Sequence, residues 1–217
     1  MVKIYGNIVS RTSRNLWMLE ELDIEYEHIS LDWINKEQLS PDYLKINPAG
    51  KVPTLVDGDI IISESIAINL YLAQKFGKSS LWPKTEEGQA QCLQWSFWAS
   101  SELEPVIYPR YREFYMKKEG DRNLNLIDEL TEKSDGILNY LNTCLSNSDY
   151  LTGNTFSVAD LNVSVIMEYL DRTGFKLDPW NKVSTWYSSC YNRKANLEIQ
   201  KRREPEADRL FKALKWK

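Results

Sequence analysis

Three hydroxyl side chains lie close together near the N-terminus, within residues 7–13. Ser10, Thr12 and Ser13 precede the first stretch with helical periodicity. The N-terminus of a helix favours an anion, because free backbone N–H groups and the positive end of the helix dipole lie there. A thiolate is such an anion, and a hydroxyl donor beside it would stabilise it further. The alternative is that Thr12 or Ser13 caps the helix and Ser10 is an ordinary loop residue.

Val52 and Pro53 begin a short apolar run directly after the turn at residues 47–50. Proline at the start of a strand is ordinarily an edge residue. A cis bond before Pro53 would instead present the backbone N–H and C=O of Val52 to an extended peptide, which would add as a strand. The pair therefore predicts either a plain sheet edge or a site for a peptide-like ligand.

Glu64 and Ser65 stand at the start of another predicted helix. The N–H groups and the Ser65 hydroxyl there can bind a carboxylate, and the Glu64 carboxylate can bind an ammonium group. An α-amino acid carries both of these groups, a carboxylate and an ammonium group, on one carbon atom. Ordinary capping of the helix by Ser63 or Ser65 is the alternative.

The composition argues against several other classes of function. The 217 residues carry a net charge of -4, which gives no strong positive field for nucleic acid or an anionic membrane surface. Cys92, Cys144 and Cys190 are odd in number and widely spaced, which argues against a disulfide framework and a zinc site. The single histidine, His28, argues against histidine-rich metal sites and a Ser-His-Asp hydrolase. We predict no metal.

The chain carries no pattern for membrane insertion or export. No apolar run approaches the ~20 residues that span a bilayer. The N-terminus begins with a strand pattern in place of a charged and then apolar signal. A cytoplasmic location is therefore expected.

The elements that must position these residues form two groups along the chain. Periodicity in the first group predicts strand, helix, strand, short helix, two hairpin strands and helix, in the order βαβαββα. These elements correspond to residues 2–5, 16–23, 25–31, 41–44, 52–56, 60–62 and 65–76. We expect an α/β domain at residues 1–77, ending at Gly77.

The second group is helical throughout. A polar linker at residues 78–88 precedes an all-α domain at residues 89–217. Its predicted helices are residues 90–118, 124–145, 158–172 and 182–192. Ser157, with Asp160 three residues later, predicts a variant of the capping box at the third helix. The basic cluster at residues 201–203 is interpreted as a solvated face.

Residues 47–55, 63–68 and 157–160 resemble, in the same order, the three most recognisable segments of the glutathione transferases. The resemblance spans both domains and implies a thioredoxin-like fold for the first. It also implies a cis bond at Pro53 and backbone pairing of Val52 with the cysteinyl unit of glutathione. Recognition of the γ-glutamyl group would fall to Glu64 and Ser65. Lys51 and Lys36 would approach the glycine carboxylate.

Ser10 lies four residues before Arg14, which resembles the spacing of the activating serine in the theta and phi-like branches of that family. The resemblance therefore implies that Ser10 activates the thiol, with Thr12 and Ser13 left as alternatives. Tyr5 lies inside the first strand, too far before the helix to match the tyrosine of other branches. No cysteine precedes Cys92, so thiol–disulfide exchange through a protein cysteine is not expected.

The implied reaction is conjugation of the glutathione thiolate to small hydrophobic electrophiles, a detoxification activity, with glutathione as co-substrate and no cofactor. The first alternative is another glutathione-dependent reaction that uses the same thiolate: isomerisation, dehalogenation or peroxide reduction. A non-catalytic interaction module is the alternative from another class. We expect the electrophile pocket between the domains. The candidates for its aromatic lining, of which one or two would contact the ligand, are Trp95, Trp98, Tyr108, Tyr111 and Tyr115. A homodimer is also implied, through the Glu64 helix and the first helix of the second domain.

Overall fold

The computed structural model describes residues 1–77 and 80–214, and these divide into two compact units. Residues 1–77 and 193–214 form the first unit, and residues 80–192 form the second. The boundaries predicted from the sequence assign everything after residue 89 to one domain. The structure instead groups the last helix with the N-terminal elements.

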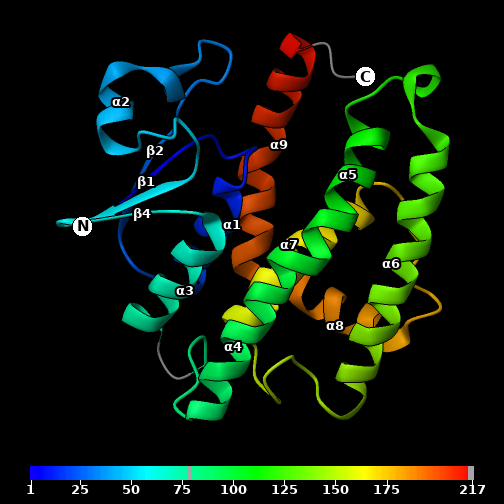
Figure 1. The fold of residues 1–217 in the computed structure, drawn as a ribbon. Coiled ribbons are helices and arrows are strands. Elements are labelled where there is room, and N and C mark those ends of the chain that lie inside the picture. The colour runs from blue at the N-terminus through cyan, green and yellow to red at the C-terminus, as the bar shows by residue number, and fades with distance from the viewer. Residues whose placement is uncertain (78–79, 215–217) are drawn as a thin grey trace. The chain divides into compact units, whose positions relative to one another are not determined.

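A four-stranded mixed sheet organises the first unit, in the order β2-β1-β3-β4 (Figure 1). The strands are β1 (Val2–Tyr5), β2 (Tyr26–Ile29), β3 (Thr54–Asp57) and β4 (Ile60–Ser63). Val2 pairs with Tyr26 in the parallel β1–β2 ladder, and Lys3 pairs with Val56 in the antiparallel β1–β3 ladder. The Asp-Gly turn predicted between the apolar runs closes the β3–β4 hairpin, with Gly58 at φ 62°.

The helices of this unit are α1 (Thr12–Leu22), α2 (Pro41–Ile46) and α3 (Ser65–Phe76). The apolar faces of α1 and α3 pack with the sheet, and α1 packs directly on α3, whereas α2 contributes one buried residue, Tyr43. Fully buried side chains come from the sheet, α1 and α3: Ile4, Leu16, Leu19, Leu55, Ile68 and Leu72. The predicted βαβαββα order and the thioredoxin-like fold are confirmed.

A further helix, α9 (Lys194–Leu214), packs along α1 (Figure 1). No separate helix is predicted there, although it falls within the all-α domain predicted for residues 89–217. The interpretation of residues 201–203 as a solvated face holds for the exposed Lys201 and is wrong for Arg202 and Arg203. Arg203 is only 7% exposed, and Arg202 donates to Glu20 at 2.8 Å and to Tyr26 at 3.0 Å. The partners lie more than 170 residues earlier in the chain, so no local pattern reveals them.

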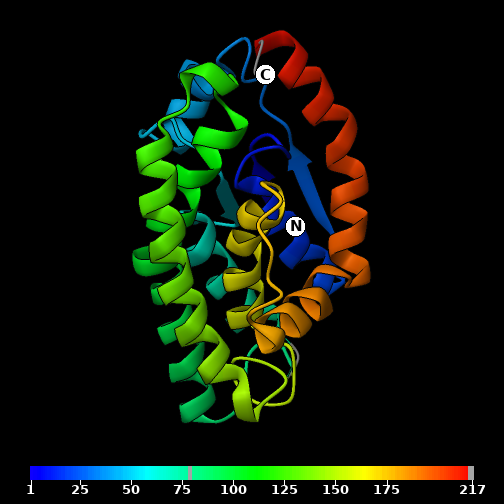
Figure 2. The same ribbon diagram turned by 90° about the vertical axis from the view of Figure 1, so that its right-hand side faces the viewer.

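The second unit is all-helical in its described residues, as predicted. It contains α4 (Glu86–Trp98), α5 (Glu104–Tyr115), α6 (Leu124–Cys144), α7 (Val158–Asp171) and α8 (Asn181–Tyr191). Figure 2 shows α6 running beside α5. The predicted helix at residues 90–118 is interrupted by a π-helical segment, Ala99–Leu103. Pro105 follows it and lacks the N–H that would continue an α-helical ladder.

Helix α7 begins with the predicted capping box at Ser157 and Asp160. The buried Asp160 carboxylate accepts hydrogen bonds from the backbone N–H groups of Leu151 and Ser157, the Ser157 hydroxyl and the indole of Trp186. One side chain therefore ties α7 to the preceding loop and to α8. No helix within residues 1–77 and 80–214 is long and apolar enough to cross a membrane.

Candidate active site

Gly6 brings two of the predicted site segments together. Its φ of +136° lies in a region that side chains rarely adopt. A Cβ at this position would lie 2.2 Å from Oγ1 of Thr12 and 2.9 Å from Cβ of Val52. The side chains of Thr12, the first residue of α1, and of Val52, before β3, therefore both lie against Gly6, and only glycine leaves room for that approach.

The three hydroxyl groups of the loop have different surroundings. Thr12 is completely buried, with Oγ1 2.8 Å from Oγ of Ser10. The Ser13 hydroxyl donates to the carbonyl of Ser10 at 3.0 Å. Ser10 itself is half-buried. Burial therefore argues against Thr12, whereas Ser10 and Ser13 are both half-buried and each lies within hydrogen-bond distance of a backbone carbonyl.

The Ser10 hydroxyl is held on two sides. It lies 2.6 Å from the carbonyl of Asn7, to which it can donate, and its oxygen accepts the backbone N–H of Thr12 at 3.1 Å. Helix α1 begins two residues after Ser10, so the positive end of its dipole lies at this loop. An anion placed here would meet both a turnable hydroxyl and the helix terminus.

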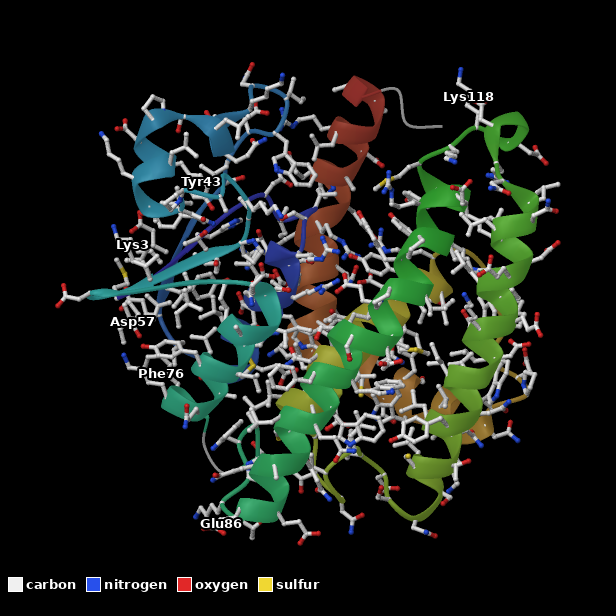
Figure 3. All side chains as sticks on the ribbon, viewed as in Figure 1. Lys3, Tyr43, Asp57, Phe76, Glu86 and Lys118 are labelled. Carbon is white, nitrogen blue, oxygen red and sulfur yellow. The ribbon has the colours of Figure 1, made fainter. Side chains whose placement is uncertain are left out.

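The Val52–Pro53 peptide bond is cis, as the resemblance implies. The pairing of β3 begins at Thr54, so Val52 lies beyond both ladders. The turn before it is anchored at the Lys51 carbonyl, which accepts the Tyr43 hydroxyl at 2.5 Å and the Asn47 amide at 2.9 Å. Figure 3 labels Tyr43, which comes from α2. The Lys51 side chain is exposed.

The start of α3 is held by α1. Ser65 is buried, its hydroxyl lies 3.4 Å from Nη1 of Arg14, and its carbonyl accepts the Asn15 amide at 2.8 Å. Glu64 before it is exposed and has φ 72°, a conformation that costs a non-glycine residue about 1–3 kcal/mol and is common at ligand sites. From the sequence, Arg14 is recognised only by its spacing from Ser10, and Asn15 is not predicted as a site residue. Two adjacent polar residues ahead of the apolar stripe of α1 were the available signal.

Lys36 is the predicted residue whose place is least defined by contacts. It is exposed, with φ 55°, and its backbone N–H and carbonyl bond to Trp33 and Leu39 of its own segment. None of the hydrogen bonds described for residues 1–77 joins it to the Ser10 loop, Val52 or Glu64. Its role toward a glycine carboxylate stays a prediction.

The cysteine thiols lie far along the chain from these segments. Cys92 and Cys190 are buried, and Cys144 is exposed. Burial raises the pKa of Cys92 to about 11, against weaker opposing hydrogen bonds from Ser157 and Ala159. Cys92 therefore stays a protonated thiol near neutral pH and is not a nucleophile.

Comparison with known proteins connects these segments to a family. Residues 1–74 match the family model of the glutathione S-transferase N-terminal domain, and residues 103–194 match that of the C-terminal domain. Glutathione S-transferase F10 of Arabidopsis thaliana is 32% identical over 206 residues, covering 92% of this chain and 96% of the relative. Glutathione S-transferase 1 of Triticum aestivum is 29% identical over 208 residues, covering 89% of this chain and 91% of the relative.

Solved structures agree with the sequence matches. Glutathione transferase F7 from Populus trichocarpa has a TM-score of 0.84 at 28% identity, covering 93% of this chain and 98% of that one. A glutathione S-transferase-I bound with lactoylglutathione has a TM-score of 0.83 at 28% identity, covering 91% and 97%. The matches span both units, and the chain belongs to the glutathione S-transferase family.

Proposed function

We propose that this chain is a glutathione transferase that activates the glutathione thiol at Ser10 and conjugates it to small hydrophobic electrophiles. The observation that carries the proposal is the meeting of the Ser10 loop and Val52 at Gly6. A cysteinyl unit paired with the backbone of Val52 would carry its sulfur toward that loop. The named relatives and the lactoylglutathione-bound structure support the same ligand class.

The γ-glutamyl end of the ligand would bind at the start of α3. Ser65 and the backbone there, with Arg14 behind them, suit its α-carboxylate, and the exposed Glu64 suits its ammonium group. Lys51 lies one residue before Val52, on the exposed side, where it would meet the glycine carboxylate. These assignments place three charged groups of one tripeptide at two segments of the first unit, the start of α3 and the turn before β3.

The chemistry requires a stabilised thiolate. Lowering the thiol pKa from ~8.5 to ~6.5 takes about 2.7 kcal/mol. A helix N-terminus supplies about 0.3–1 kcal/mol, and a hydrogen bond to a charged group supplies about 1.5–3 kcal/mol. The Ser10 hydroxyl must turn from the Asn7 carbonyl to the sulfur to contribute, so its net share is smaller. The thiolate then attacks the electrophilic carbon, an S–C bond forms, and the leaving group departs with its electron pair.

The Ser10→Ala variant tests the assignment, with Ser13→Ala as a matched control. We expect Ser10→Ala to lower kcat roughly 10- to 100-fold, because it removes one charge-assisted hydrogen bond, while the Kd for glutathione changes little. Ser13→Ala keeps kcat within about threefold, since its hydroxyl only closes a turn on the Ser10 carbonyl. Calorimetry with glutathione, an ultraviolet titration of the thiolate and turnover of an aromatic electrophile measure the three quantities. An unchanged kcat in Ser10→Ala would remove Ser10 from the mechanism.

The same assays separate the competing functions. Turnover of a peroxide, a dehalogenation substrate or an isomerisation substrate in place of conjugation would favour another glutathione-dependent reaction. Absence of glutathione binding would favour a non-catalytic module. The cytoplasmic location and the electrophile pocket between the domains stay predictions.

Aromatic residues of the second unit support the hydrophobic character of the electrophile. Tyr108 and Tyr115 on α5 stack with Tyr111 at ring distances of 6.2 and 4.9 Å, and Tyr169 on α7 lies 4.8 Å from Tyr111. Tyr111 is buried, whereas Tyr108, Tyr115 and Tyr169 are half-exposed. We assign the electrophile contacts to these half-exposed rings and the packing role to Tyr111.

The homodimer is also a proposal. Phe97 is 67% exposed and Leu93 42% exposed, one turn apart on α4, and Ile60 and Ile61 are exposed on β4. Such apolar surfaces are typical of interfaces. Sedimentation equilibrium should show a dimer that Phe97→Glu weakens. Leu124→Glu, at a similarly exposed leucine on α6, should leave the dimer intact, and a monomeric wild type would contradict the proposal.

A further inference from the structure

Asn7 is the residue to which the Ser10 loop is attached. Its side chain is buried, and its carbonyl accepts both the backbone N–H of Ser10 at 3.0 Å and the Ser10 hydroxyl at 2.6 Å. Its own Oδ1 accepts the N–H of Val9 at 2.8 Å. The position of Asn7 therefore determines both the backbone position of Ser10 and the direction of its hydroxyl.

The remaining polar group of Asn7 bonds to the other end of the chain. Nδ2 donates to Oε1 of Glu206 on α9 at 3.0 Å, across 199 residues of sequence. Arg209 binds both carboxylate oxygens of Glu206, at 2.9 and 2.7 Å, and its hydrogen bond lowers the pKa of Glu206. Glu206 is therefore ionised near neutral pH, with its charge compensated by Arg209.

An ionised carboxylate only accepts hydrogen bonds, so it selects the amide end of the Asn7 side chain. That choice leaves Oδ1 facing the N–H of Val9. Without Glu206 the buried amide would lack its acceptor, and its two ends could exchange places. The contact with α9 thus sets the rotamer of Asn7 and, through the loop, the carbonyl that holds the Ser10 hydroxyl.

We propose that Asn7 and Glu206 are positioning residues for Ser10, so that α9 adjusts thiol activation through a hydrogen-bonded chain inside the first unit. The inference rests on the proposed function. The Asn7 carbonyl competes with a bound thiolate for the Ser10 proton, and its placement decides how readily the hydroxyl turns to the sulfur. Neither side chain takes part in the chemical step itself.

The test compares Glu206→Ala with Arg193→Gln. Arg193, directly before α9, binds Glu21 at 2.7 Å through two nitrogens and so attaches this segment to the last turn of α1, at the end opposite to Ser10. We expect Glu206→Ala to lower kcat about 5- to 10-fold, because one hydrogen bond is lost. The thiolate titration of bound glutathione should also move to higher pH. The KM for glutathione should change less than about twofold, and Glu206→Gln, which keeps an acceptor oxygen, should recover most of the kcat.

Arg193→Gln should lower thermal stability but leave kcat and the thiolate titration unchanged. Equal losses of kcat in the two variants would show a general docking effect of α9 and overturn the proposal. A folded Glu206→Ala protein with wild-type kcat and titration would also overturn it.

Amide hydrogen exchange makes the test independent of the proposed function. Val9 and Ser10 should exchange faster in Glu206→Ala than in the wild type and in Arg193→Gln. Equal exchange in all three proteins overturns the positioning link. If the wild type shows no glutathione turnover, the proposed function fails and this exchange comparison alone decides whether Glu206 holds the loop.

Discussion

At the residue scale, Gly6 decides whether the Ser10 loop and Val52 can touch. A Cβ at Gly6 would overlap the side chains of Thr12 and Val52. Gly58 also has a positive φ, +62° against +136° at Gly6, but no atom lies within 4 Å of its Cβ position. Gly58 therefore shows the backbone requirement of a turn without the steric requirement found at Gly6.

We predict that Gly6→Ala weakens glutathione binding at least about tenfold and destabilises the fold, because the added methyl group forces the two segments apart. Gly58→Ala should destabilise the protein by about 1–2 kcal/mol, since it pays only for the positive φ, and should leave the Kd unchanged. Calorimetric titration and thermal unfolding of both variants measure these effects. Wild-type affinity in Gly6→Ala would contradict the role of Gly6.

His28 introduces a pH dependence at the same scale. Its Nε2–H donates to the Gly6 carbonyl at 2.8 Å, and burial lowers its pKa, with a smaller effect of Arg202 in the same direction. The unfolded chain therefore takes up a proton before the folded protein does. The contribution of neutral His28 to the free energy of unfolding is complete above about pH 6.5, the pKa of His28 in the unfolded chain. It is lost as the pH falls below that value.

His28→Gln should remove this pH dependence, because the glutamine amide can still donate to Gly6 but does not titrate. We expect the Tm of the wild type to fall more than that of the variant between about pH 7.5 and about pH 5.5. Thermal unfolding at the two pH values checks this, and parallel losses in both proteins would assign the effect to carboxylates instead.

The sequence locates some of these residues and not others, for physical reasons. Val52, Glu64 and Ser65 stand beside turn and helix-start signals, which are local. The burial of Thr12, which argues against it as the activating hydroxyl, is not shown by any spacing in the sequence. Asn7 and Arg14 act through partners 199 and 51 residues away, so their roles appear only in the folded chain.

At the element scale, local signals predict an element where its stability is local. The capping box and the apolar stripe predict α7, and the Asp-Gly turn predicts the β3–β4 hairpin. Helix α9 is mostly polar and is stabilised by ion pairs with α1, such as Arg202 with Glu20, so its sequence resembles a solvated tail. The predicted helix at residues 90–118 differs from the structure at the π-helical segment, because the effect of Pro105 on the preceding turn is not visible in periodicity.

Asp160→Ala should destabilise the protein by about 3–5 kcal/mol, since it leaves four buried donors without an acceptor. Asp171→Ala, at an exposed position on the same helix, should change stability by less than about 0.5 kcal/mol. Urea unfolding followed by tryptophan fluorescence gives both values. A small loss in Asp160→Ala would mean that water or rearranged side chains satisfy those donors.

At the scale of the whole molecule, the first unit contains both ends of the described chain. Helix α9 follows the second unit in sequence but packs on α1, with the ion pair Glu20–Arg202 along it and Glu21–Arg193 directly before its first residue. Stability should follow this packing and not the order along the chain. We therefore expect the Ser10 loop (residues 7–13), α1 and α9 to unfold together as one cooperative unit.

Native-state hydrogen exchange in increasing denaturant tests this grouping. We expect the amides of α9 to open at the same denaturant concentration as those of α1, and apart from those of α8, which immediately precedes α9 in sequence. Joint opening of α9 with α8 would contradict the grouping.

The position of α9 in the sequence also affects the order in which the protein is made. The ribosome makes residues 80–192 as one continuous piece, so the described part of the helical unit is present before α9 is made. The unit that carries Ser10 begins first but receives its last helix last. At roughly 5–20 residues per second, the N-terminal elements wait on the order of ten seconds for α9. The first unit, which carries the candidate active site, is therefore complete only after residues 80–192 and α9 have been synthesised.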